Sequence, residues 1–216
     1  MTHILFYIIP SNGIFLSFFF LVRSERPPGC NFLLGSMLLA LSCLSAQQYF
    51  LSLTDPSQPL ASHYILNELL ISPFLFLYTF TFLHPSRKIK IWLHMLFIMT
   101  NLPLLFWVNW SNSLLMYFII NAFNLMNGMY LFASIYTILD SLKGKSGEPG
   151  QFPASAYQWI YLLNLMVIGA SSLSIMWYAL CPARMACLAQ FAKGLVIYFT
   201  YIKILDKAVF NGFPHP

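Results

Sequence analysis

Two charged residues, Glu68 and Lys193, lie inside long apolar stretches of the chain. A charged group in apolar surroundings is costly, so it is kept where it pairs or acts. Both residues are expected at a similar depth from the same end of a helical bundle. They therefore form a candidate ion pair with a ligand-binding or switching role. A structural pair, or a Glu68 that only reaches the polar boundary, is the alternative.

Three asparagines, Asn121, Asn124 and Asn127, recur at every third position of one apolar stretch. On a helix of 3.6 residues per turn they stay within a sector of about 120°. This spacing is compatible with a polar cavity lining, and Asn121 and Asn124 are kept as candidate binding residues. Hydrogen bonds between helices are the favoured alternative.

Gln47 and Asn67 extend this candidate set, because they lie at the ends of two successive apolar stretches, near Glu68. Together they could line a pocket that opens at the outer end of the bundle. A belt of interfacial polar groups is the alternative for each residue.

No motif for catalysis or cofactor binding accompanies these residues. The chain has no nucleophile elbow and no glycine-rich phosphate loop, and its histidines and four cysteines lack metal-ligand spacing. We therefore predict no enzyme activity, no metal site and no cofactor.

The composition indicates which kind of protein surrounds these residues. Of 216 residues, 59% are hydrophobic, 18% aromatic and 8% charged. A soluble domain carries roughly 25% charged residues, and a disordered chain is low in hydrophobicity. The composition thus favours a single polytopic membrane domain over residues 1–216.

Continuous apolar runs of about 20 residues predict helices long enough to cross a bilayer. The prediction is an all-α bundle of seven transmembrane helices. The expected spans are 4–22, 32–51, 64–83, 91–108, 114–139, 159–180 and 185–205.

The distribution of basic residues predicts the orientation of this bundle. If the spans alternate, nine basic residues fall on one side: Arg23, Arg26, Arg87, Lys88, Lys90, Lys143, Lys145, Lys203 and Lys207. This places the N-terminus outside and the C-terminus in the cytoplasm. The formal net charge of +5 is then explained by topology, and the expected location is the inner (cytoplasmic) membrane of the cell, with multiple passes.

Four stretches carry a resemblance to a known family. They are 13–39, 71–96, 157–163 and 195–210, and they include Ile71-Ser-Pro-Phe-Leu-Phe-Leu-Tyr78 and Tyr157-Gln-Trp-Ile-Tyr-Leu-Leu163. In this order they resemble the membrane-embedded N-terminal half of AraC-type transcriptional regulators. The resemblance covers nearly the whole chain, but the sequence ends at Pro216, where the helix-turn-helix domain of such regulators would begin.

The resemblance implies a sensor that relays an extracellular or lipid-phase signal to the cytoplasmic side. The partners it implies are membrane lipids, an unidentified small ligand and a second copy of the chain in a homodimer. It implies no direct contact between this segment and nucleic acid.

Two other functions fit parts of the pattern. Seven spans, with Lys193 in the last and Glu68 in the third, are similar to retinal-binding rhodopsins, although Gln190 stands where an acidic residue is expected. A small secondary transporter would leave two related halves, and spans one to three and five to seven show no clear repeat.

Overall fold

The computed structural model describes residues 2–22, 29–53, 61–84, 90, 94, 113–143, 154–180 and 182–205. Within these ranges the chain is all-helical, as the sequence predicted. The helices are α1 (Thr2–Val22), α2 (Cys30–Leu53), α3 (Ala61–Leu83), α5 (Ser113–Leu142), α6 (Ala154–Leu180) and α7 (Pro182–Leu205). Their positions follow six of the seven apolar runs, and the run 91–108 lies outside the described residues apart from His94.

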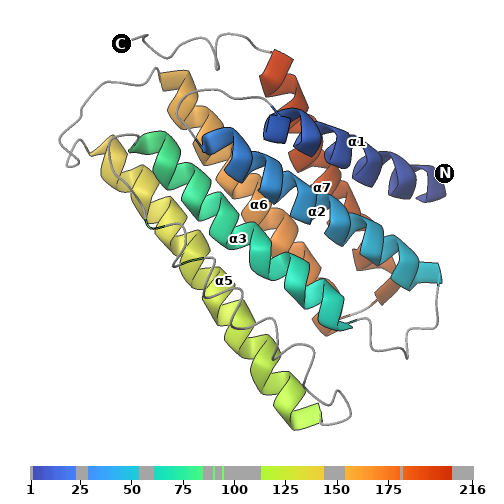
Figure 1. Cartoon of the computed structure of the whole chain (residues 1–216). Helices are drawn as coiled ribbons and strands as arrows, with labels where there is room; N and C mark the ends of the chain where they lie inside the picture. Colours follow the sequence, from blue (N-terminus) through green and yellow to red (C-terminus); the bar gives the residue numbers. More distant parts are fainter. Residues whose placement is uncertain are drawn as a thin grey trace.

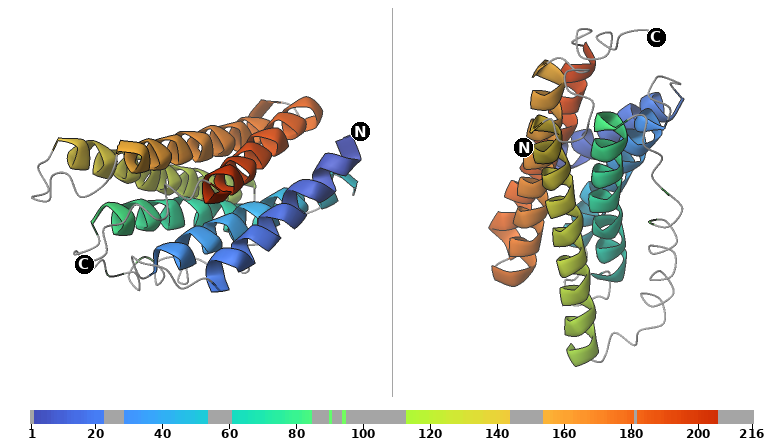
Figure 2. Two further views of the ribbon diagram at one scale, coloured as in Figure 1. Left: turned by 90° about the horizontal axis from the view of Figure 1, so that it is seen from above. Right: turned by 90° about the vertical axis from the view of Figure 1, so that its left-hand side faces the viewer.

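The helices form two packed layers (Figure 1). The first layer runs α1, α2, α3 and α5, each packing on the next, while α6 and α7 pack on each other as the second layer. Contacts of α7 with α1 and α2, and of α6 with α3 and α5, join the layers. The two views of Figure 2 show α6 and α7 along one side of the row.

The predicted transmembrane architecture is wrong. Within the described parts of the chain, no helix combines the length and apolar character that crossing a lipid bilayer requires. This finding overturns the fold of seven transmembrane helices, with its outside N-terminus and cytoplasmic C-terminus. It also overturns the expected multi-pass location in the inner membrane.

Uncharged polar side chains also enter the core of the bundle. The transmembrane prediction rested on the scarcity of charged residues, whereas serine, threonine and asparagine also occur along the apolar runs. These residues are buried within the bundle, as Ser42, Thr79 and Asn164 illustrate with no exposed surface. A buried polar group needs a hydrogen-bond partner, and each of these three has one.

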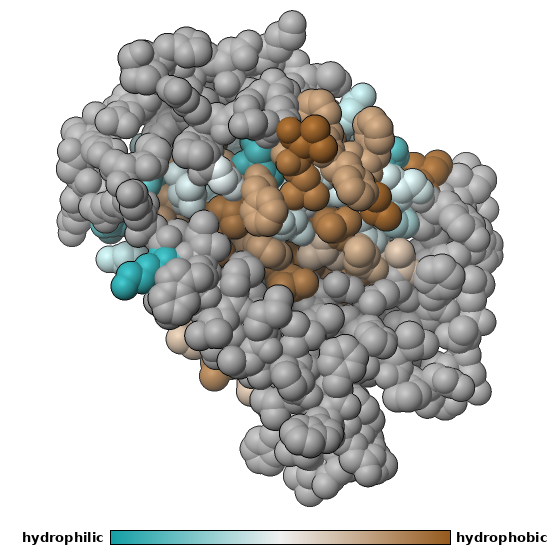
Figure 3. Space-filling view, in the orientation of Figure 1, coloured by the Kyte–Doolittle hydropathy of each residue, from teal (hydrophilic) through white to brown (hydrophobic). Residues whose placement is uncertain are grey.

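The hydrophobic core fills the space between the two layers. Its almost completely buried leucines include Leu33, Leu34, Leu38 and Leu41 of α2, Leu75 and Leu77 of α3 and Leu163 of α6. Other apolar side chains remain exposed, on α1, α5, α6 and α7 above all, and Figure 3 shows apolar residues over the part of one face where α1 and α2 lie. The core therefore centres on α2 and α3, the middle helices of the row.

The first turn of α2 begins at a glycine that the backbone requires. Gly29 has a φ of 91°, a conformation that side chains rarely allow. Its carbonyl accepts a hydrogen bond of 3.0 Å from the amide of Leu33, which closes the first turn of the helix.

A second glycine sets the distance between α1 and α2. A Cβ atom added to Gly35 would lie 3.0 Å from the carbonyl oxygen of Ser17 and 3.1 Å from Cγ of Leu21. The backbone atom cannot move aside as a side-chain end would. We expect Gly35→Ala to lower the free energy of unfolding by about 1–3 kcal/mol, measured by chemical denaturation.

Gly128 of α5 is the matched control, because a Cβ atom there would meet nothing within 4 Å. Alanine favours a helix over glycine by about 1 kcal/mol, so Gly128→Ala should stabilise the protein. A Gly35→Ala protein as stable as Gly128→Ala would contradict the close packing of α1 on α2.

Candidate functional site

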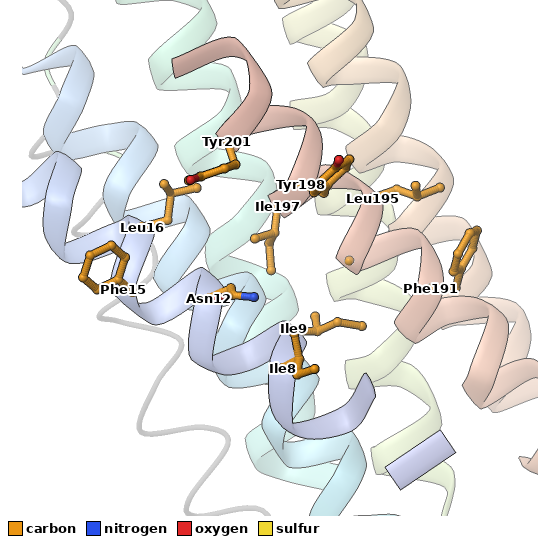
Figure 4. A pocket seen from close by; sticks show the side chains of 11 residues that line it. Ile8, Ile9, Asn12, Phe15, Leu16, Phe191, Leu195, Ile197, Tyr198 and Tyr201 are labelled. Carbon is orange, nitrogen blue, oxygen red and sulfur yellow. The ribbon is translucent and has the colours of Figure 1, made fainter. Parts of the chain in front are cut away.

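A groove lies between α1 and α7 (Figure 4). It encloses about 620 Å³. We call it the α1–α7 groove, and its lining residues are Ile8, Ile9, Asn12, Phe15, Leu16, Phe191, Gly194, Leu195, Ile197, Tyr198 and Tyr201.

Two glycines bring the walls of the α1–α7 groove together. A Cβ atom on Gly13 would overlap the Ser42 hydroxyl and lie 2.7 Å from Cδ1 of Ile197. A Cβ atom on Gly194 would lie 2.9 Å from Cδ1 of Ile9. The backbones therefore meet at these positions, and the larger side chains beside them leave the groove between the helices.

Side chains around the groove are mainly apolar, with a small number of polar groups. Figure 4 shows the Asn12 amide between the two helices and the ring of Tyr201 close to Leu16. Tyr198 keeps 61% of its surface exposed, so its phenol is accessible to an incoming molecule. An apolar cavity of roughly 300–1,000 Å³ with few polar groups is typical of small-molecule sites.

Behind the groove, the helices are fixed by a buried polar network that joins α3, α5 and α6. The side-chain amide of Asn164 donates to Thr79 Oγ1 at 3.0 Å and to the carbonyl of Ile160 at 2.9 Å. The Ser134 hydroxyl is within hydrogen-bond distance of both Asn164 Oδ1 and Thr79 Oγ1. Asn164, Thr79 and Ser134 have no exposed surface, so the network is isolated from solvent.

An aromatic cluster fixes α6 against α3 and α7. The indole of Trp159 donates a hydrogen bond of 3.1 Å to the Tyr78 hydroxyl, and its ring stacks on Phe199 with centroids 5.3 Å apart. Burial raises the pKa of the nearby Cys30 thiol to about 12. Because the thiolate is the reactive form, this cysteine is chemically inert at neutral pH.

Lys193 is the one member of the predicted ion pair whose side chain the structure describes. Only 1% of its surface is exposed, and it makes contacts within the bundle. It does not line the α1–α7 groove, although its neighbour Gly194 does. The side chain of Glu68, in α3, lies outside the described residues, so the pairing stays a prediction.

Among the other predicted site residues, none whose side chain the structure describes lines the groove. The side chains of Gln47, in α2, and Asn67, in α3, lie outside the described residues. Asn121 is exposed and Asn124 half-buried, while Asn127 is buried with 7% exposure. Because exposure changes strongly along this asparagine row, the structure does not present it as one polar surface.

The groove residues were not predicted because most of them are apolar and resemble ordinary core residues in the sequence. The available signal was a pair of helix-interior glycines, Gly13 and Gly194, beside aromatic and branched side chains. Glycine within a helix often marks a close backbone approach. The sequence alone does not identify which helix such a glycine approaches.

The chain matches no family model, no curated protein and no solved structure. The resemblance to AraC-type regulators gains no support from relatives and stays a prediction.

Proposed function

We propose that this chain is a helical module that senses a small apolar ligand bound in the α1–α7 groove. The proposal keeps the small ligand that the sequence suggested and abandons the relay across a membrane. The observation that carries it is the apolar groove of about 620 Å³ with Asn12 and two tyrosines on its walls.

The apolar lining determines the class of ligand. Ile8, Ile9, Leu16 and Ile197 offer only dispersion contacts and removal of apolar surface from water. Asn12 supplies hydrogen-bond donors and an acceptor, and a tyrosine hydroxyl can donate or accept. A hydrophobic molecule with one or two polar atoms fits this set, whereas a highly charged metabolite does not.

The packing of α1 supplies a physical basis for sensing. This helix packs chiefly on α2 and meets α7 over a shorter stretch. A ligand held between α1 and α7 contacts both helices. It therefore favours the arrangement in which the two helices lie side by side over one in which they are apart. Such a ligand shifts an equilibrium only through its different affinity for the two arrangements.

Binding is tested with N-phenyl-1-naphthylamine, an uncharged dye that fluoresces in apolar surroundings. We expect Leu195→Glu to weaken its binding by about tenfold or more, because the bound dye would remove the new carboxylate from water without giving it a partner. The measurement is a fluorescence titration, with amide hydrogen exchange of α1 as the second readout. Bound dye should slow exchange in α1.

Leu162→Glu in α6 is the matched control. Leu162 is 42% exposed and Leu195 is 40% exposed, but Leu162 does not line the groove. Equal dye affinity for the two variants would place the dye elsewhere and defeat the proposed site. Dye binding without any change in α1 exchange would leave the groove as a binding site but refute the sensing role.

A further inference from the structure

A second cavity lies between α3 and α5, on a different side of the bundle from the α1–α7 groove. It encloses about 500 Å³. We call it the α3–α5 cavity, and its lining residues are Phe76, Phe80, His84, Phe132, Ala133, Tyr136, Thr137 and Asp140.

The lining forms two rows with the same helical spacing. Phe76, Phe80 and His84 follow one another at intervals of four residues, and so do Phe132, Tyr136 and Asp140. Residues four apart lie on the same face of a helix. Each helix thus presents one continuous row to the cavity.

The two rows lie side by side in register, because α3 and α5 run in the same direction (Figure 1). The Thr79 and Ser134 hydroxyls are 3.0 Å apart, and His84 Nε2 lies 3.4 Å from the Ser141 hydroxyl. This register brings the end of the row on α3 near Asp140. The row on α3 therefore ends beside the carboxylate that ends the row on α5.

Aromatic rings make up most of the wall on α3. The ring centroids of Phe76 and Phe80 are 6.1 Å apart, and those of Phe80 and His84 are 5.1 Å apart. On the opposite row, Phe132 and Tyr136 are exposed by 71% and 61%. Their rings are thus available to a ligand. The face of an aromatic ring carries negative charge density and attracts a cation within about 6 Å of its centroid.

Asp140 gives the cavity a negative charge. It is the one acidic residue among the lining, and the lining contains no lysine or arginine. The hydroxyl of Thr137 already donates to the carbonyl of Ala133 at 2.8 Å. Lys143, one turn beyond Asp140, is exposed and does not line the cavity.

We propose that the α3–α5 cavity binds a small organic cation of the quaternary ammonium class. Such a cation is poorly hydrated, so it loses little water on entering an aromatic site, and Asp140 balances its charge. A hard metal ion is a poor fit, because it requires several oxygen ligands and the cavity offers one carboxylate. A neutral apolar molecule would displace water from Asp140 without supplying a positive charge or a hydrogen bond in its place.

Choline is the probe that tests this proposal, measured by isothermal titration calorimetry with the whole chain. The comparison ligand is its uncharged isostere, in which a tert-butyl group replaces the trimethylammonium group. The two have nearly the same shape and differ in charge. We expect choline to bind at least about tenfold more tightly than the isostere. Equal affinities, or no binding of choline, would overturn the proposal.

Two variants locate the binding. Asp140→Asn preserves the shape of the side chain, removes its charge and should reduce the preference for choline over the isostere to the part that the rings supply. Phe132→Leu removes an exposed ring of the wall and should weaken choline binding, whereas Phe18→Leu, on α1 and exposed by 57%, should leave it unchanged. If Asp140→Asn retains the full preference, or if both phenylalanine variants behave alike, the site is not the α3–α5 cavity.

Discussion

Replacement of Trp159 by alanine should lower the free energy of unfolding by about 3–5 kcal/mol. The side chain is 1% exposed, so its removal leaves a cavity in the core. It also removes the stacked ring from Phe199 and the hydrogen-bond donor from the Tyr78 hydroxyl. Urea denaturation followed by circular dichroism measures the change without depending on tryptophan fluorescence.

Two milder variants separate packing from hydrogen bonding at this position. Trp159→Phe keeps an aromatic ring beside Phe199 but removes the indole donor, and Tyr78→Phe removes the acceptor. Each should cost about 1 kcal/mol for the hydrogen bond, to which the smaller ring adds a packing loss in Trp159→Phe. A double-mutant cycle then isolates the bond. If Trp159→Ala lowers the free energy of unfolding no more than Trp159→Phe does, the Trp159 ring does not pack in the core as described.

The helices were predictable because continuous apolar runs of about 20 residues are too long for strands and are typical of helices. The run 64–83 corresponds to α3 (Ala61–Leu83), and the run 185–205 corresponds to α7 (Pro182–Leu205). In each case the helix begins a few residues earlier, because a helix extends beyond its most hydrophobic part. Hydropathy therefore located the elements without determining what surrounds them.

The environment of the helices was not predictable from charge counts alone. Asn164 was not singled out from the sequence. In the structure it shares a buried network with Ser134 and Thr79. These partners are separated by 30 to 85 positions along the chain, so no local pattern reveals their pairing.

The candidate site was less predictable than the fold. Lys193 and its neighbour Gly194 illustrate the reason: the lysine attracted attention because of its charge, whereas the glycine lines the groove. Which of two adjacent helix residues faces a cavity depends on the rotation of the helix against its neighbours. That rotation is set by tertiary packing, here by the approach of Gly13 to Ile197.

Asn164→Ala should be the second large destabilisation, about 2–4 kcal/mol. The substitution removes a buried amide that binds Thr79, Ser134 and the Ile160 carbonyl. The hydroxyls of Thr79 and Ser134 lose that partner in a region without solvent, and a small cavity adds to the cost. Thr200→Val is the control, because the Thr200 hydroxyl donates only to Val196 of its own helix, and it should cost about 1 kcal/mol or less.

An apolar replacement of the whole network distinguishes its two costs. Asn164→Leu alone leaves both hydroxyls without the amide, but the triple variant Asn164→Leu, Thr79→Val, Ser134→Ala removes every side-chain polar group of the network. Because replacement of all partners by apolar groups of similar shape is nearly neutral, the triple variant should recover most of the stability lost in Asn164→Leu. Urea denaturation of the three proteins measures this recovery. If the three substitutions instead add up without recovery, the residues do not form one network, and the packing of α3, α5 and α6 must be fixed by apolar contacts alone.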